Sequence, residues 1–82
     1  MVPERWALIG KGRLGGLPMV QVAREKYDPK ARLTIWKLVR KGDAWYAIGQ
    51  WISIGRYREH ERPRKLSDSY TDQQLVKYAE QA

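Results

Sequence analysis

The sequence predicts an α+β fold: a small antiparallel β-sheet of about four strands in meander order, with one C-terminal α-helix packed on one face. Two stretches carry this prediction. Residues 33–54, LTIWKLVRKGDAWYAIGQWISI, are rich in β-branched and aromatic residues and contain the turn signal Gly42-Asp43 near their middle. Residues 71–82 show apolar side chains at helical spacing. We therefore expect a single domain over residues 1–82, with the sheet over about 5–58, a basic connector over 55–66 and the helix over about 71–81.

The N-terminal part predicts two strands joined by a loop. Residues 5–9 are expected to form the first strand and residues 19–27 the second, where Val20 and Val22 alternate with other residue types. Residues 10–18, GKGRLGGLP, hold four glycines and one proline, a composition that predicts a flexible hairpin loop. The loop contains a G-x-G-x-x-G pattern, but a dinucleotide site needs that pattern inside a βαβ unit, so no cofactor is expected. Residues 28–30, Asp-Pro-Lys, predict a turn.

The central stretch predicts a long hairpin of strands 33–41 and 45–54. A two-residue turn at 42–43 would set a register with one aliphatic and one aromatic face, and would place Trp36 over Gly49. A slip of one residue would exchange the two faces. The aliphatic face would hold Leu33, Ile35, Lys37, Val39, Tyr46, Ile48, Gln50 and Ile52, and the aromatic face Thr34, Trp36, Leu38, Arg40, Trp45, Ala47, Gly49 and Trp51.

The remaining residues predict a basic connector and a helix. Residues 55–65, GRYREHERPRK, contain five Lys/Arg and two Glu, and Pro63 argues against a helix through them. Thr71 is the expected N-cap, with Gln74 at capping-box spacing. Leu75, Tyr78 and Ala79 share one face of the helix, which we expect to dock on the aliphatic face of the hairpin. The aromatic face would then lack an obvious cover.

Charge and composition narrow the class of partner. The net charge is +7, and residues 1–65 hold fifteen Lys/Arg against six Asp/Glu. Such an excess on the β-rich part favours polyanions, although ordinary solubility charge would have the same magnitude. The chain has no cysteine and one histidine, so neither a disulfide nor a metal site is expected. No apolar run predicts a membrane span or a signal peptide, and we expect a cytoplasmic protein with no membrane partner.

These features lead to the hypothesis of a small, non-enzymatic, basic nucleic-acid-binding protein, such as a phage or plasmid accessory protein. Lysine and arginine side chains would bind phosphates, and those tryptophans that are exposed rather than buried in the core would stack on unpaired bases. DNA and RNA remain equal candidates. The expected nucleic-acid-binding residues are Lys11, Arg13, Arg24, Lys26, Trp36, Arg40, Lys41, Trp45, Trp51, Arg56, Arg58, Arg62, Arg64 and Lys65.

Two other functions are alternatives, and composition does not separate the first of them from nucleic-acid binding. The tryptophan-rich face would also suit a protein-interaction module, an inhibitor or adaptor with an acidic protein partner, because Trp, Tyr and Arg are enriched in interface hot spots. A small ribonuclease would need His60 to act with Glu59 or Glu61. Adjacent residues of an extended segment point to opposite sides, so no catalytic residue is assigned. A homodimer through an exposed sheet edge is a further expectation.

Overall fold

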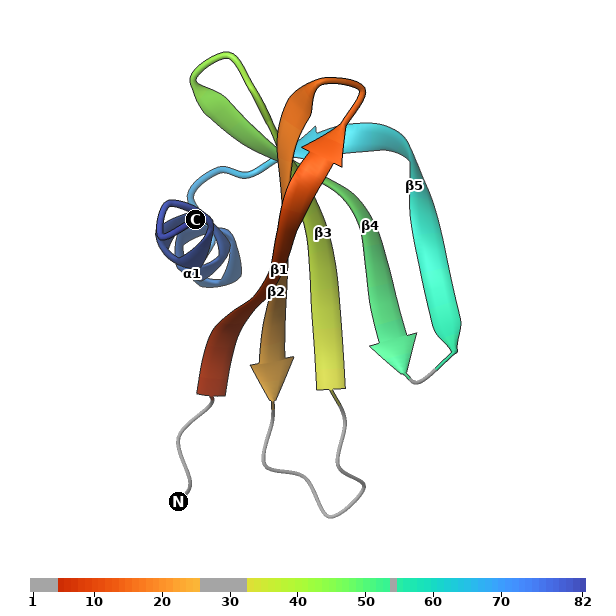
Figure 1. The fold of residues 1–82 in the computed structure, drawn as a ribbon. Helices are drawn as coiled ribbons and strands as arrows, with labels where there is room; N and C mark the ends of the chain where they lie inside the picture. Colours follow the sequence, from red (N-terminus) through yellow and green to blue (C-terminus); the bar gives the residue numbers. More distant parts are fainter. Residues whose placement is uncertain (1–4, 26–32, 54) are drawn as a thin grey trace.

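The computed structural model describes residues 5–25, 33–53 and 55–82, which form one antiparallel sheet and one helix (Figure 1). The five strands lie in the order β1-β2-β3-β4-β5, so each strand pairs with its neighbour in sequence. The α+β class, the meander and the C-terminal helix are thus confirmed, with one strand more than expected. The elements are β1 (Arg5–Leu14), β2 (Leu17–Glu25), β3 (Leu33–Lys41), β4 (Ala44–Ser53), β5 (Arg56–Lys65) and α1 (Tyr70–Ala79).

The first hairpin is longer than the sequence predicts, because most of the expected loop at 10–18 belongs to strands. Only Gly15 and Gly16 form the turn, and both adopt a positive φ (57° and 81°), as a tight two-residue turn requires. Gly10 lies within β1 beneath the side chain of Gln21, whose Oε1 would be 3.0 Å from an added Cβ. The glycines of the G-x-G-x-x-G pattern are therefore strand and turn residues. The turn expected at 28–30 lies outside the described residues.

The second hairpin begins as predicted and then departs from the expected register. Strand β3 has the predicted bounds, and Gly42 (φ 65°) lies in the predicted two-residue turn. One extra residue, Ile48, interrupts the pairing of β4 with β3. Beyond this bulge Gly49 faces Lys37, so the predicted position of Trp36 over Gly49 is wrong. Because of this extra residue, the residues of β4 after Ile48 lie on the face opposite to the one that an unbroken register predicts.

The predicted basic connector is a fifth strand, which forms the edge of the sheet beside β4. The pairing runs from Ala47↔Arg64 to Gly49↔Glu59, so residues 60–63 of β5 lie opposite a single residue of β4. This irregularity, which we call the 60–63 bulge, contains Pro63. Proline has no amide hydrogen and is tolerated at an edge or a bulge. Figure 1 shows β5 bending across the end of the sheet toward α1.

Helix α1 covers the face of the sheet that bears Trp6, Trp36 and Trp45, which we call the helix side. Trp36 and Trp45 are each 6% exposed and belong to the same buried cluster as Leu75 and Ala79 of the helix. Trp6 of β1 adds a further aromatic ring: it stacks on Trp36 with ring centroids 5.7 Å apart. The expectation that the helix docks on the aliphatic face is wrong, because burying these large rings removes more apolar surface from water.

The start of α1 is fixed by a network that reaches the end of β5. Ser69, rather than the expected Thr71, is the N-cap, and its Oγ accepts a hydrogen bond from the Asp72 amide (3.1 Å). The Asp72 carboxylate is buried and accepts hydrogen bonds from Arg64 Nη1 (2.9 Å) and from the Ser67 amide (3.1 Å). Burial alone would raise the pKa of Asp72, but the bonds from Arg64, Ser67 and Ser69 outweigh it and lower that pKa.

Within the described ranges α1 is the one helix. It has ten residues, too few and too polar to cross a membrane.

Candidate nucleic-acid interface

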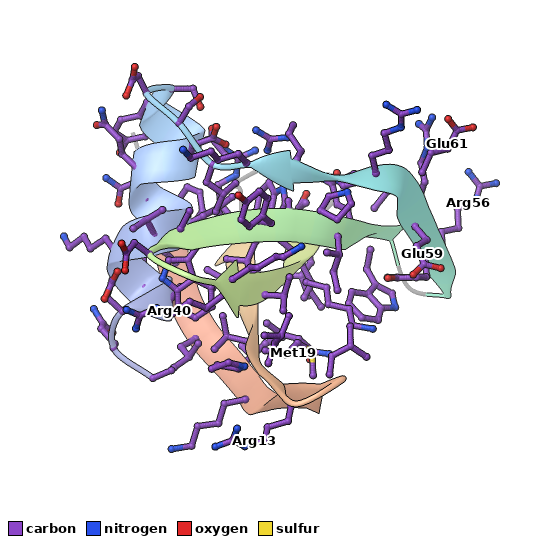
Figure 2. The ribbon with its side chains drawn as sticks, turned by 90° about the horizontal axis from the view of Figure 1, so that it is seen from above. Arg13, Met19, Arg40, Arg56, Glu59 and Glu61 are labelled. Carbon is purple, nitrogen blue, oxygen red and sulfur yellow. The ribbon has the colours of Figure 1, made fainter. Side chains whose placement is uncertain are left out.

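The face of the sheet opposite α1 lacks a covering helix or strand among the described residues, and we call it the open face. Strand register places its side chains in three rows that run across the sheet. Figure 2 shows that the sheet is curled. Met19 of β2 and Glu59 of β5 both point into the space between the β1–β2 hairpin and β5. The rows are Ala7, Ala23, Ile35, Trp51 and Tyr57; then Gly10, Gln21, Lys37, Gly49 and Glu59; then Gly12, Met19, Val39, Tyr46 and Lys65.

An aromatic pair is the main feature of the open face. The rings of Trp51 and Tyr57 lie 4.4 Å apart between centroids, at an interplanar angle of 50°. The Ile48 bulge brings Trp51 to this face, and the pairing of β5 with β4 sets Tyr57 directly beside it. Tyr57 is 39% exposed and Trp51 is partly exposed, so both rings are accessible to a ligand.

Tyr57 is held in place by a glycine beneath it and a cation above it. Its ring and hydroxyl lie over Gly49, at the position that a β-carbon would fill. Lys37 Nζ lies 5.8 Å from the Tyr57 ring centroid, within cation–π range. Burial, and then the nearby carboxylate of Glu59, raise the pKa of Tyr57 above its ordinary value of 10.0. The phenol is therefore protonated at neutral pH and can donate a hydrogen bond.

Positive charge surrounds this pair. Lys37 and Lys65 outnumber Glu59, the one carboxylate of the three rows. Strand β5 adds Arg56, Arg58 and Arg62 along the sheet edge, all exposed. In the part of the chain that the structure describes, the one ion pair is Arg64–Asp72. Lys37, Lys65 and these three arginines thus form no ion pair with another described residue.

Four of the residues expected to bind nucleic acid form contacts within the fold. Trp36 and Trp45 are buried beneath α1, which corrects the expectation that they stack on bases. The Arg24 guanidinium carbon lies 5.2 Å from the ring centroids of both Trp6 and Trp36, on the helix side. Arg64 pairs with Asp72 at the start of α1.

The other expected residues fall into separate groups. Trp51 is on the open face, and Arg56, Arg58, Arg62 and Lys65 are on the exposed strand β5. Lys11, Arg13, Arg40 and Lys41 are exposed near the two hairpin turns. Lys26 lies outside the described residues.

Two open-face residues were missed by sequence reasoning, namely Tyr57 and Lys37. Interpreting residues 55–65 as a connector concealed Tyr57, because the charged residues around it show no apolar alternation that would predict a strand. Lys37 was assigned to the aliphatic face, which proved to be the open one.

The residues considered for metal binding and for ribonuclease chemistry lie apart from the open face. Groups of three or more His, Cys, Asp or Glu side chains that could hold a metal are absent from those ranges. His60 is half-buried and lies in the 60–63 bulge of β5. Neither Glu59 nor Glu61 forms an ion pair with it in the described part of the chain.

Comparison of the chain with protein-family models, with curated protein sequences and with solved structures finds no match. Its function must therefore be inferred from the chemistry of its own surface.

Proposed function

We propose that this protein binds single-stranded nucleic acid on its open face, without catalysing a reaction. The observation that carries the proposal is the accessible pair of Trp51 and Tyr57, set beside Lys37 and along the basic edge strand β5. Both rings have accessible surface on which a base can stack.

The chemistry of the open face matches the two parts of an unpaired nucleotide. Bases stack on aromatic rings whatever their sequence, because every base has a π-face. Phosphates are attracted by the cations that flank the rings, namely Lys37, Lys65 and the β5 arginines. The protonated hydroxyl of Tyr57 adds a donor for a base edge or a phosphate oxygen. Paired bases in a duplex would not offer their faces to Trp51 and Tyr57, so single strands are favoured.

The first test replaces Tyr57 by alanine and measures the affinity for a fluorescein-labelled single-stranded oligonucleotide by anisotropy. Loss of one stacking partner should weaken binding by about 5- to 150-fold, which corresponds to about 1–3 kcal/mol per stacked base. Tyr70→Ala is the matched control, because Tyr70 is 65% exposed and lies on α1 rather than on the open face. Equal affinities for the Tyr57 and Tyr70 variants would contradict the proposal. DNA and RNA oligonucleotides are titrated in parallel.

The second measurement is the salt dependence of the same affinity. Contact with about four phosphates predicts a slope of log K against log salt of about −3, from about −0.7 per phosphate of a single strand. Lys37→Gln should reduce that slope, whereas Lys77→Gln, on the exposed surface of α1, should leave it unchanged. Absence of oligonucleotide binding at about 50 mM salt, where electrostatic affinity is strong, would refute the proposal and favour the acidic protein partner.

A further inference from the structure

A second surface lies on the helix side of the sheet, next to the end of the open face that Gly12 and Met19 form. A groove of about 530 Å³ lies between the two hairpin turns and the C-terminal end of α1. Its floor is formed by Val20, Trp45 and Ala79, which belong to the buried core. Its rim carries three cations, Lys11 and Arg13 from β1 and Arg40 from β3.

The two arginines are positioned by their own hairpins. Arg13 Nη1 donates a hydrogen bond to the Gly16 carbonyl (3.2 Å), and Arg40 Nε donates to the Gly42 carbonyl (3.3 Å). Each bond uses one N–H of a guanidinium that has five, so the others remain for a ligand. Figure 2 shows Arg40 beside the helix and Arg13 toward the far end of β1. The groove thus has oriented donors on two sides.

The single carboxylate side chain of the groove is already engaged. Glu80 Oε1 accepts a hydrogen bond from Trp45 Nε1 at 3.3 Å. Three cations against this one carboxylate leave the lining side chains with a net positive charge. A simpler role for the cations would be to offset the partial negative charge at the helix C-terminus. Lys77 already provides a cation in the last turn of α1, so that role does not account for three more.

We propose that this groove binds the phosphate of a ligand of nucleotide size, with its flat apolar part against Pro18 and Met19, which are apolar lining residues with accessible surface. Ligand pockets typically have volumes of about 300–1,000 Å³ and combine an apolar lining with a few convergent polar groups. Arginine is well suited to phosphate because its planar fork donates two parallel hydrogen bonds. A free nucleotide and the terminal nucleotide of a strand share this chemistry. The groove shares Gly12 and Met19 with the open face but contains neither Trp51 nor Tyr57, so this proposal does not depend on the proposed function.

The test follows the indole N–H resonance of Trp45 by ¹H–¹⁵N NMR while AMP, adenosine and inorganic phosphate are added in turn. Binding of AMP should shift this resonance, because Trp45 lines the groove and bonds Glu80. Adenosine should bind at least about tenfold more weakly, since it lacks the phosphate that the arginines bind. An oligonucleotide with a 5′-phosphate that competes with AMP, when its unphosphorylated form does not, would identify a strand end as the source. If neither oligonucleotide competes with AMP, the ligand is a free nucleotide.

The decisive variant is Arg40→Gln, which removes a cation that lines the groove. The matched control is Lys77→Gln, which removes a cation from the last turn of α1. The Arg40 variant should weaken AMP binding by about tenfold or more, and the control should not. The proposal is overturned if AMP does not bind, if adenosine binds as well as AMP, or if Arg40→Gln lowers only the thermal stability. Tyr57→Ala should leave AMP binding unchanged, so failure of the groove and failure of the open face can be distinguished.

Discussion

Gly49 offers a way to remove Tyr57 from the open face without altering Tyr57 itself. A methyl group at Gly49 would occupy the space now filled by the Tyr57 ring and hydroxyl. Tyr57 is 39% exposed, so its side chain can swing toward solvent and accept the change. Gly49→Ala should therefore separate Tyr57 from Trp51 and weaken oligonucleotide binding about as much as Tyr57→Ala does, by about 5- to 150-fold.

The same substitution should have little effect on folding. The φ of Gly49 is not positive, so alanine fits its backbone and reduces the conformational freedom of the unfolded chain. Glycine in a strand is less favourable than alanine by about 0.5–1 kcal/mol. That gain offsets the displacement of Tyr57, and we expect the free energy of unfolding, measured with urea, to change by less than about 1 kcal/mol.

Two controls make this prediction specific. Gly12→Ala lies on the same face, but its β-carbon would be 3.6 Å from Met19 Cε, an ordinary contact, so its affinity should match that of the parent. The double variant Gly49→Ala/Tyr57→Ala should bind no more weakly than either single variant, because both act through one ring. Additive losses, or parental affinity of Gly49→Ala, would refute the role assigned to Tyr57.

The remaining predictions concern stability. Asp72→Asn should lower the free energy of unfolding at pH 7 by about 1–3 kcal/mol, because it weakens a buried network. The pKa of Asp72 is lowered on folding, so its contribution is present above about pH 4 and is lost as the pH falls through the folded-state pKa. The parent and variant should thus converge in acid, and a gap that is constant with pH would contradict this assignment. Gly42→Ala should cost about 1–2 kcal/mol in urea unfolding, since φ is 65° there, whereas a cost below about 0.3 kcal/mol would show that the turn can rearrange.

Local signals were sufficient for much of the fold. The turn at 42–43 combines a glycine with flanking strands of β-rich sequence, and its geometry depends on few distant contacts. The apolar stripe of α1 was also predicted from the sequence, because Leu75 and Ala79 recur at the helical period. Both are buried in the structure. The predicted N-cap, Thr71, lies two residues after the observed one, Ser69. Both residue types are good caps, and only the path of the chain from β5 selects between them.

Strand β5 could not be recognised from apolar periodicity. It is an edge strand with nine of its ten residues exposed, so neither face has to be apolar. Its hydrogen bonds to β4, rather than a buried face, hold it in the sheet. Charged residues and Pro63 on an edge also oppose pairing with a second chain, which is a common way to prevent aggregation. The features that made residues 55–65 resemble a connector are those that an exposed edge strand requires.

The position of Trp51 depends on a single residue. Up to Ala47 the register follows the turn, and an unbroken register would place Trp51 on the helix side with Trp36 and Trp45. The helix side is already filled by those two rings together with Trp6 and Tyr78. The extra residue Ile48 turns the rest of β4 over, and Trp51 then meets Tyr57 instead of the core. A bulge of this kind depends on packing on both faces at once, which no local pattern encodes. The proposed interface therefore arises from the same irregularity that the sequence alone does not reveal.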